Sequence, residues 1–214
     1  MSDTASDRQP APPGGDRRLR LALYAALAFA VIGVGAGAAS FFLGRSEAQV
    51  GVRSAIGGPF ELVDQTGKPV SEADILGKPT MIFFGYTSCP NVCPTTLSDM
   101  TVWLKELGAS AAKLNAVFVS VDPKRDTVKA MADYLSAFDP RIRGFTGTPE
   151  QIAHVIKTYR VFAKEVPGEN GGPYLVDHTA AVYLMDAKDQ FVGVIDYPET
   201  KANAVAKLKR LVGG

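Results

Sequence analysis

The sequence predicts one α/β domain, a mixed β-sheet flanked by helices, preceded by a single transmembrane helix. Residues 21–43 form an uncharged apolar segment. After it, short apolar runs typical of buried strands alternate with segments of helical periodicity. A chain of 214 residues is long enough for one ordinary domain with extra segments. The 23 Lys and Arg nearly balance the 22 Asp and Glu, which argues against nucleic acid as a partner because polyanion binding needs a basic surface.

The N-terminal region is expected to anchor the chain in a membrane. Residues 1–20 are rich in Pro, Gly, Asp and Arg and are expected to form a disordered cytoplasmic tail. As a helix, residues 21–43 are long enough to cross a hydrocarbon core of roughly 30 Å. Arg17, Arg18 and Arg20 precede this segment. The positive-inside rule therefore predicts a single-pass protein of a bacterial-type inner membrane, with the C-terminal part periplasmic or on an equivalent outer face.

Two other interpretations of this segment are weaker. Ser46 and Ala48 resemble the small residues before a signal-peptidase site, but the apolar part of a signal peptide usually runs only about 7–15 residues. A buried core helix is the other alternative, and the absence of any polar face argues against it. We therefore expect a retained anchor, a linker over residues 44–57 and one domain over residues 58–214.

The first elements of the domain are an entry hairpin and a βαβ unit. Alternation over residues 60–63 followed by the polar turn 64–69 predicts a strand and a hairpin. Thr80–Phe84 and Ala116–Val119 are continuous apolar runs, which suit parallel strands buried on both faces. The helix between them is indicated by apolar residues at helical spacing, Leu97, Met100, Leu104 and Leu107. This order requires a right-handed crossover.

The remaining elements complete a sheet covered by helices. Residues 148–151 form a capping box that begins a third helix, with proline at the first helical position. Residues 181–185 and 191–195 predict an antiparallel hairpin before a terminal helix rich in Ala, Lys and Leu. A second helix is indicated earlier by Val128, Met131, Leu135 and Phe138. The order matches a thioredoxin-like fold with an N-terminal hairpin and an inserted hairpin region.

The two cysteines are the first candidate site. Cys89 and Cys93 lie where a central strand ends and a helix begins, at the crevice where open α/β sheets bind ligands. Residues four apart on a helical turn have Cβ atoms about 5–6 Å apart, so their sulfurs can converge on one ion. Pro94 is expected at the first helical position with Cys93 at the cap, a placement that lowers a thiol's pKa. Soft sulfur ligands suit copper(I), although further ligands are needed.

A structural disulfide is the plain alternative for this pair. An exported location permits it. A bridge across so few residues, however, closes a very short loop and contributes comparatively little stability.

The motifs of the domain resemble those of the Sco (SenC) family of cytochrome c oxidase assembly proteins. The family's marks are a Cys-x-x-x-Cys-Pro loop, an aspartate-rich turn and a downstream histidine. Here they are Cys89-Pro90-Asn91-Val92-Cys93-Pro94, the turn at residues 120–127 (SVDPKRDT) and the stretch at residues 174–179 (YLVDHT). One departure is Val128, where relatives often carry proline; it affects a helix start and none of these motifs. The resemblance spans nearly the whole exported domain and the anchor.

The resemblance implies a copper metallochaperone whose ligands are Cys89, Cys93 and His178. Copper(I), copper(II) or both would be carried to the binuclear copper site of cytochrome c oxidase subunit II. Asp177 and Asp122 are expected beside the ligands, because carboxylates near ligating side chains orient them. A thioredoxin-like reductase and another copper donor are further expected partners. Considered without the resemblance, His178 is equally a loop histidine with a structural hydrogen bond.

The alternative function is a membrane-anchored thiol-disulfide oxidoreductase or redox sensor that uses Cys89 and Cys93 as its redox pair. Its substrates would be the cysteines of the oxidase subunit or of other exported proteins. The usual thioredoxin motif has two residues between its cysteines rather than three, which weighs against this function. A peroxidase is the least favoured possibility, because nothing in the cysteine loop requires peroxide chemistry.

Overall fold

The computed structural model describes residues 56–168 and 171–213, together with Leu21 and Tyr24. The chain divides into two compact units, residues 1–51 and 52–214, and the fold and the site belong to the second. The predicted tail and most of the predicted membrane span and linker lie outside the described residues. Among the described residues, no helix is both long enough and apolar enough to cross a membrane.

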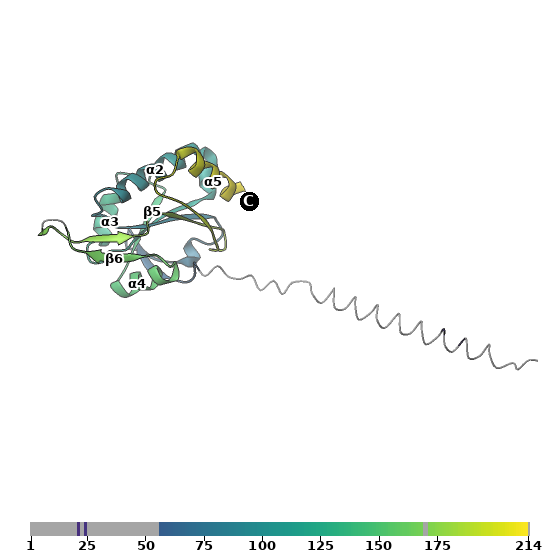
Figure 1. Cartoon of the computed structure of the whole chain (residues 1–214), viewed down its shortest axis with the longest axis horizontal. Coiled ribbons are helices and arrows are strands. Elements are labelled where there is room, and N and C mark those ends of the chain that lie inside the picture. The colour runs from purple at the N-terminus through teal and green to yellow at the C-terminus, as the bar shows by residue number, and fades with distance from the viewer. Residues whose placement is uncertain (1–20, 22–23, 25–55, 169–170, 214) are drawn as a thin grey trace, which may run out of the picture. The chain divides into compact units, whose positions relative to one another are not determined.

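A seven-stranded mixed sheet forms the centre of the second unit, in the order β2-β1-β5-β4-β3-β8-β9 (Figure 1). β3 is parallel to β4 and β4 to β5, whereas the outer pairs are antiparallel. The strands are β1 (Glu61–Asp64), β2 (Pro69–Ser71), β3 (Thr80–Gly85), β4 (Asn115–Ser120), β5 (Ile142–Thr146), β8 (Val182–Met185) and β9 (Phe191–Ile195). The predicted parallel βαβ pair, the entry hairpin and the second hairpin are confirmed.

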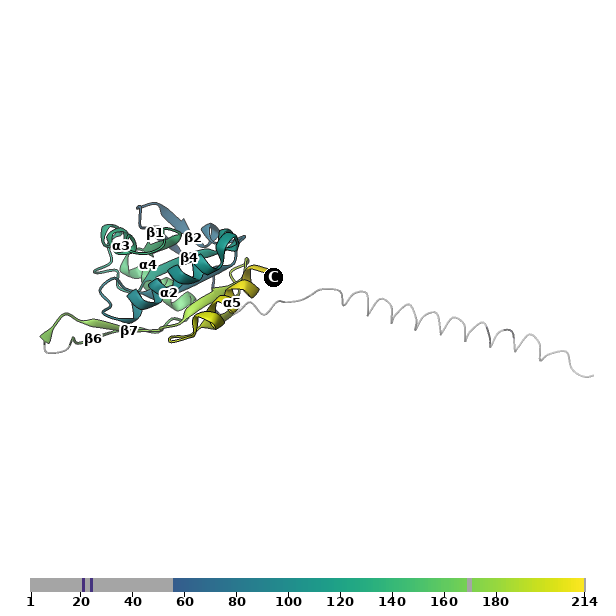
Figure 2. The same ribbon diagram turned by 90° about the horizontal axis from the view of Figure 1, so that it is seen from above.

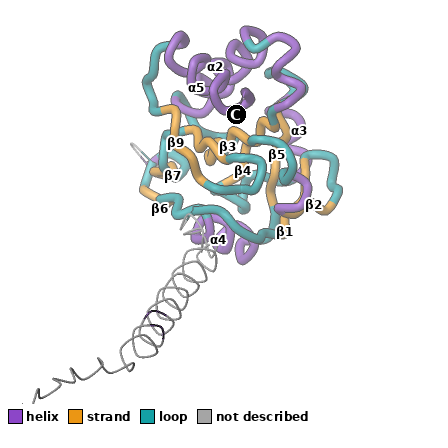
Figure 3. Tube along the Cα trace, turned by 90° about the vertical axis from the view of Figure 1, so that its right-hand side faces the viewer, coloured by secondary structure: helices purple, strands orange, loops and turns teal. Residues whose placement is uncertain are grey.

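Helices cover both faces of this sheet. They are α2 (Val92–Glu106), α3 (Val128–Leu135), α4 (Pro149–Thr158) and α5 (Lys201–Gly213), with short 3-10 helices η1 (Glu72–Asp74) and η2 (Gly108–Lys113). α2 and α5 lie together on one side of the sheet and α4 lies on the other (Figures 1 and 3). α4 begins with the predicted capping box, in which Thr148 and Gln151 bond each other's backbone N–H.

The core has two layers because successive strand residues point to opposite faces. Phe84 of β3 packs on Tyr159 beside α4, with ring centroids 5.5 Å apart. On the other face Phe118 of β4 packs on Tyr134 of α3 at 5.9 Å. Every residue of β3 is buried. Burial on both faces explains why this strand is a continuous apolar run rather than an alternating one.

Two further strands form a separate hairpin, β6 (Ala163–Val166) and β7 (Leu175–His178). Their antiparallel register pairs Ala163 with His178. Figure 2 shows this hairpin projecting from the domain, at the end away from the C-terminus of α5. The inserted hairpin region was expected without bounds, and β6 and β7 were not among the predicted strands.

Candidate metal centre

The cysteine loop connects the carboxyl end of β3 to the start of α2. Cys89 lies in the loop and is partly exposed, whereas Cys93 lies in the first turn of α2 and is fully buried. The backbone N–H of Cys89 donates to the Tyr86 carbonyl at 3.3 Å. The backbone N–H of Cys93 points to the Cys89 sulfur at 3.4 Å. The helix start therefore folds one cysteine back toward the other.

The predicted start of α2 is wrong by two residues. The helix begins at Val92 with Asn91 at its cap, so Cys93 is the second helical residue and Pro94 the third. The first four N–H groups of a helix have no acceptor within it, so proline loses no hydrogen bond at the third position either. The position of Pro94 therefore limits which residues can begin α2, but it does not determine which of them is the first.

The fold brings His178 to the two cysteines from 85 residues beyond Cys93. His178 is the last residue of β7. Its Nε2 lies 3.4 Å from the Cys93 sulfur, and the ligand atoms of Cys89, Cys93 and His178 all lie within 4.8 Å of one another. The three predicted ligands thus form one cluster that can hold a metal ion.

The His178 ring is oriented by backbone and aromatic contacts. Nδ1 lies 3.0 Å from the Thr179 carbonyl oxygen. Because a carbonyl oxygen only accepts, Nδ1 is the donor in this contact, and Nε2 is the ring nitrogen that faces the cysteines. Tyr86 and Phe83 meet the ring edge-on, with centroids 5.8 and 6.0 Å away. A neutral imidazole that donates through Nδ1 can bind a metal through Nε2, so this orientation suits a metal ligand.

The two thiols have opposite pKa shifts. A hydrogen bond from the Cys93 side chain lowers the pKa of Cys89 to about 3, against the opposing effect of partial burial. The same hydrogen bond, burial and the negative charge of Cys89 raise the pKa of Cys93 above its ordinary value. The expectation that the helix start lowers the pKa of Cys93 is therefore wrong, because the hydrogen bond with Cys89, burial and the negative charge of Cys89 all raise it.

Asp126 ties the cysteine loop to the neighbouring strand ends. Its carboxylate is fully buried and accepts hydrogen bonds from the Thr87 hydroxyl at 2.7 Å and the Ser120 hydroxyl at 2.7 Å. The Thr87 backbone N–H also points to it. Burial raises the pKa of Asp126, and these hydrogen bonds oppose the rise. Sequence reasoning did not single out Asp126, since nothing local distinguishes it from Asp122 in the same turn.

Asp122 contacts the hairpin that carries His178, rather than His178 itself. It accepts a hydrogen bond from the Tyr174 hydroxyl at 2.8 Å and forms an ion pair with Arg125. Arg125 stacks on the Tyr174 ring at 3.8 Å and donates to the Tyr174 carbonyl at 2.9 Å. Asp177 has an exposed side chain and pairs in the strand register with Lys164. Asp122 therefore contacts the segment that leads into β7, whereas the Thr179 carbonyl is the group that bonds the imidazole.

Gly85 leaves the space that the Cys93 sulfur occupies. A Cβ added at residue 85 would lie 2.7 Å from that sulfur and 2.8 Å from the buried Phe118 ring. Gly85→Ala is therefore expected to displace Cys93 and weaken binding of copper, the predicted metal, by about 10–100-fold, the loss typical when the support of a ligand is removed. Overpacking should also cost about 1–3 kcal/mol of stability.

A copper(I) competition titration and a denaturant titration would measure these two effects. Gly213→Ala is the matched control, because a Cβ there meets nothing within 4 Å. Unchanged copper affinity in Gly85→Ala would contradict the close placement of Cys93.

Comparison with known proteins finds relatives along most of this chain. The family model described as SCO1/SenC matches residues 48–213. The mitochondrial protein SCO2 of Saccharomyces cerevisiae is 37% identical over 160 residues, which cover 74% of this chain and 53% of that protein. The SCO2-like protein of Rickettsia conorii is 40% identical over 138 residues, covering 64% and 67% of the two chains. The chain therefore spans about half the length of the yeast relative.

Solved structures of family members also resemble the domain. The structure of Bradyrhizobium japonicum ScoI with copper bound has a TM-score of 0.68 and 52% identity, covering 73% of this chain and 99% of that one. The copper-bound structure of yeast Sco1 has a TM-score of 0.68 and 36% identity, covering 74% and 89%. These matches confirm the predicted thioredoxin-like α/β fold.

Proposed function

This chain belongs to the SCO1/SenC family, and from this membership we propose that it binds one copper ion through Cys89, Cys93 and His178 and delivers it during assembly of cytochrome c oxidase. The observation that carries the proposal is the convergence of two sulfurs and one imidazole nitrogen within 4.8 Å. Solved relatives with copper bound support the choice of metal.

The donor set fits copper as a cargo. Thiolate sulfur is a soft ligand that favours copper(I), while imidazole accommodates either copper oxidation state. Cys89 is poised as a thiolate by its low pKa, and Cys93 must release its proton when the metal enters. Metal binding therefore releases protons and becomes tighter as the pH rises.

Transfer requires that an acceptor reach the metal. The three ligands are not equally buried, and this difference would permit such an approach. Cys93 is fully buried, whereas Cys89 and His178 are partly exposed. Ligands of an acceptor can approach from the side of Cys89 and His178 while Cys93 still holds the ion. The proposed acceptor is the binuclear copper site of oxidase subunit II. An anchor at residues 21–43, with the domain in the periplasm, would raise the effective concentration near that acceptor.

Replacing His178 by alanine is expected to weaken copper binding while leaving thiol-disulfide exchange by Cys89 and Cys93 active. The substitution removes one ligand, and both sulfurs remain. A copper competition titration and a disulfide-exchange assay on the same preparation would measure the two activities. His154→Ala is the matched control, because His154 is exposed on α4 and its Nε2 bonds the Pro59 carbonyl at 3.1 Å. Equal loss of copper binding and exchange would indicate a folding defect instead.

The asymmetry of the two thiols supports a second candidate function, thiol-disulfide exchange on exported proteins. The Cys89 thiolate would attack one sulfur of a target disulfide, forming a mixed disulfide and releasing the other target sulfur as a thiolate. Cys93 would then lose its proton and attack the Cys89 sulfur, releasing the second target thiolate and leaving a Cys89–Cys93 disulfide. Two electrons pass to the target. A thioredoxin-like reductase would restore the pair, and a separate donor would supply copper.

A further inference from the structure

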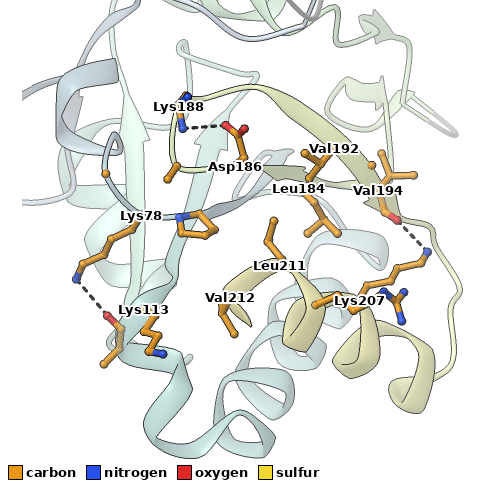
Figure 4. Close-up of a pocket in the computed structure, with 16 residues that line it drawn as sticks. Lys78, Lys113, Leu184, Asp186, Lys188, Val192, Val194, Lys207, Leu211 and Val212 are labelled. Atoms are coloured by element: carbon orange, nitrogen blue, oxygen red, sulfur yellow. Dashed lines mark hydrogen bonds between the residues drawn. The ribbon is translucent and has the colours of Figure 1, made fainter. Parts of the chain in front are cut away.

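A basic cleft of about 910 Å³ lies at the end of the sheet away from the cysteine loop (Figure 4). It is lined by residues 77–79 before β3, by the end of η2, by the β8–β9 loop and strand β9, and by the last turns of α5. The cysteines follow the opposite, carboxyl end of β3. This cleft is therefore separate from the candidate metal centre.

Positive charge dominates the rim of the basic cleft. Five of its sixteen lining residues are Lys or Arg and one is Asp. Two of the cations are already engaged: Lys78 donates to the Ala112 carbonyl at 3.1 Å, and Lys207 pairs with Glu199 at 2.7 Å. The three others, Lys113, Lys188 and Arg210, are exposed.

These three cations are available to a ligand. Within residues 56–168 and 171–213, no ion pair joins Lys113, Lys188 or Arg210 to a carboxylate. The floor beneath them is apolar, with Val192 55% exposed and Leu211 partly exposed. Figure 4 shows Leu184, Val192 and Leu211 converging between the lysines. Apolar area surrounded by unpaired cations is the composition of surfaces that bind anionic lipid membranes.

The described chain enters the domain beside this cleft. The backbone N–H of Gly58 donates to the Asp189 carboxylate at 2.9 Å, and Asp189 belongs to the same β8–β9 loop as the cleft residues Asp186 and Lys188. The fourteen residues 44–57 separate this entry point from the predicted membrane span. Even fully extended, they would reach only about 50 Å. Within the described chain, the loop that lines the basic cleft therefore lies beside the residue at which the chain enters the domain.

We propose that the basic cleft binds the anionic phospholipid headgroups of the membrane in which the chain is anchored. Docking there would orient the opposite end of the sheet, with Cys89 and His178, away from the bilayer and toward a partner. The cations attract the anionic headgroups, and the apolar floor adds a hydrophobic contact. Binding should therefore weaken as salt screens the charges. The orientation rests on the predicted span, whereas lipid binding by the cleft does not depend on copper or on the proposed function.

The test is binding of residues 52–214 to phospholipid vesicles. This part is expected to fold alone, because it contains the whole described core and a 52% identical chain that aligns with it over 99% of its length has been solved as a structure. Cosedimentation is measured with vesicles of phosphatidylcholine alone and with added phosphatidylglycerol. The domain should bind only the anionic vesicles, less at high salt, and Lys113→Glu with Arg210→Glu should reduce binding by at least about tenfold.

The matched control is Lys68→Glu with Lys164→Glu, which changes the net charge equally at exposed sites outside the cleft. It should retain most of the binding, and circular dichroism should show both double variants folded. Equal loss in the two variants would overturn the proposal, because attraction would then follow net charge alone. Absence of binding to anionic vesicles would also overturn it. So would cleft-dependent binding to a polyglutamate peptide but not to vesicles, which would indicate an acidic protein partner.

Discussion

Replacing Cys93 by alanine is expected to abolish tight, stoichiometric copper binding. Its sulfur is fully buried and lies 3.4 Å from Nε2 of His178, so it is the ligand best shielded from water. The loss of copper affinity should exceed about 10–100-fold, which is the loss typical of removing a group that only supports a ligand. It should also exceed the loss in His178→Ala, because a single remaining thiolate no longer provides the soft sulfur pair that favours copper(I). Titration against a copper(I) chelator measures both variants.

Cys93→Ser separates the loss of sulfur from the loss of volume. Serine nearly preserves the size of the side chain but offers a hard oxygen, so its copper affinity should fall as far as that of the alanine variant. Thermal unfolding should show both variants folded, because the substitution removes one small buried group. Tight copper binding by Cys93→Ser would contradict the assignment of Cys93 as a ligand.

Oxidation of the cysteine pair is expected to prevent copper loading. In the structure both cysteines are free. A disulfide would hold the two sulfurs at about 2.05 Å from each other, so that neither could bind a metal as a thiolate. Copper would then meet only His178 until two electrons reduce the bridge. Protein oxidised with diamide and freed of reductant should lose copper stoichiometry, and dithiothreitol should restore it.

His178→Ala provides the control for this redox experiment. It should form the same disulfide, seen as a loss of two thiols in a thiol titration, so that the effect of oxidation is separated from the loss of the imidazole ligand. If diamide-treated wild-type protein keeps the copper stoichiometry and affinity of the reduced form, redox gating is wrong. The copper site would then not require both sulfurs as thiolates.

The predicted elements that the structure confirms are those with a strong local pattern. β3 and β4 are apolar runs because both of their faces are covered, and the capping box of α4 lies within four consecutive residues. β5 went unpredicted although it lies in the middle of the sheet, between β1 and β4. Its sequence contains Arg143 and Gly144, which interrupt the apolar run. A larger residue does not fit at position 144, because a Cβ there would lie 2.5 Å from the Met131 side chain of α3.

The sequence by itself determined the order of the main strands and helices, the position of the cysteine loop and, through the family's motifs, the candidate ligands. The spacing of apolar residues in one segment indicates which of them are buried, whichever segment packs against it. Only the tertiary structure placed His178 against the cysteines, made Asp126 the link between strand ends and gave the two thiols opposite pKa shifts. Each of these depends on distance and burial between segments far apart in the chain, which no local pattern encodes.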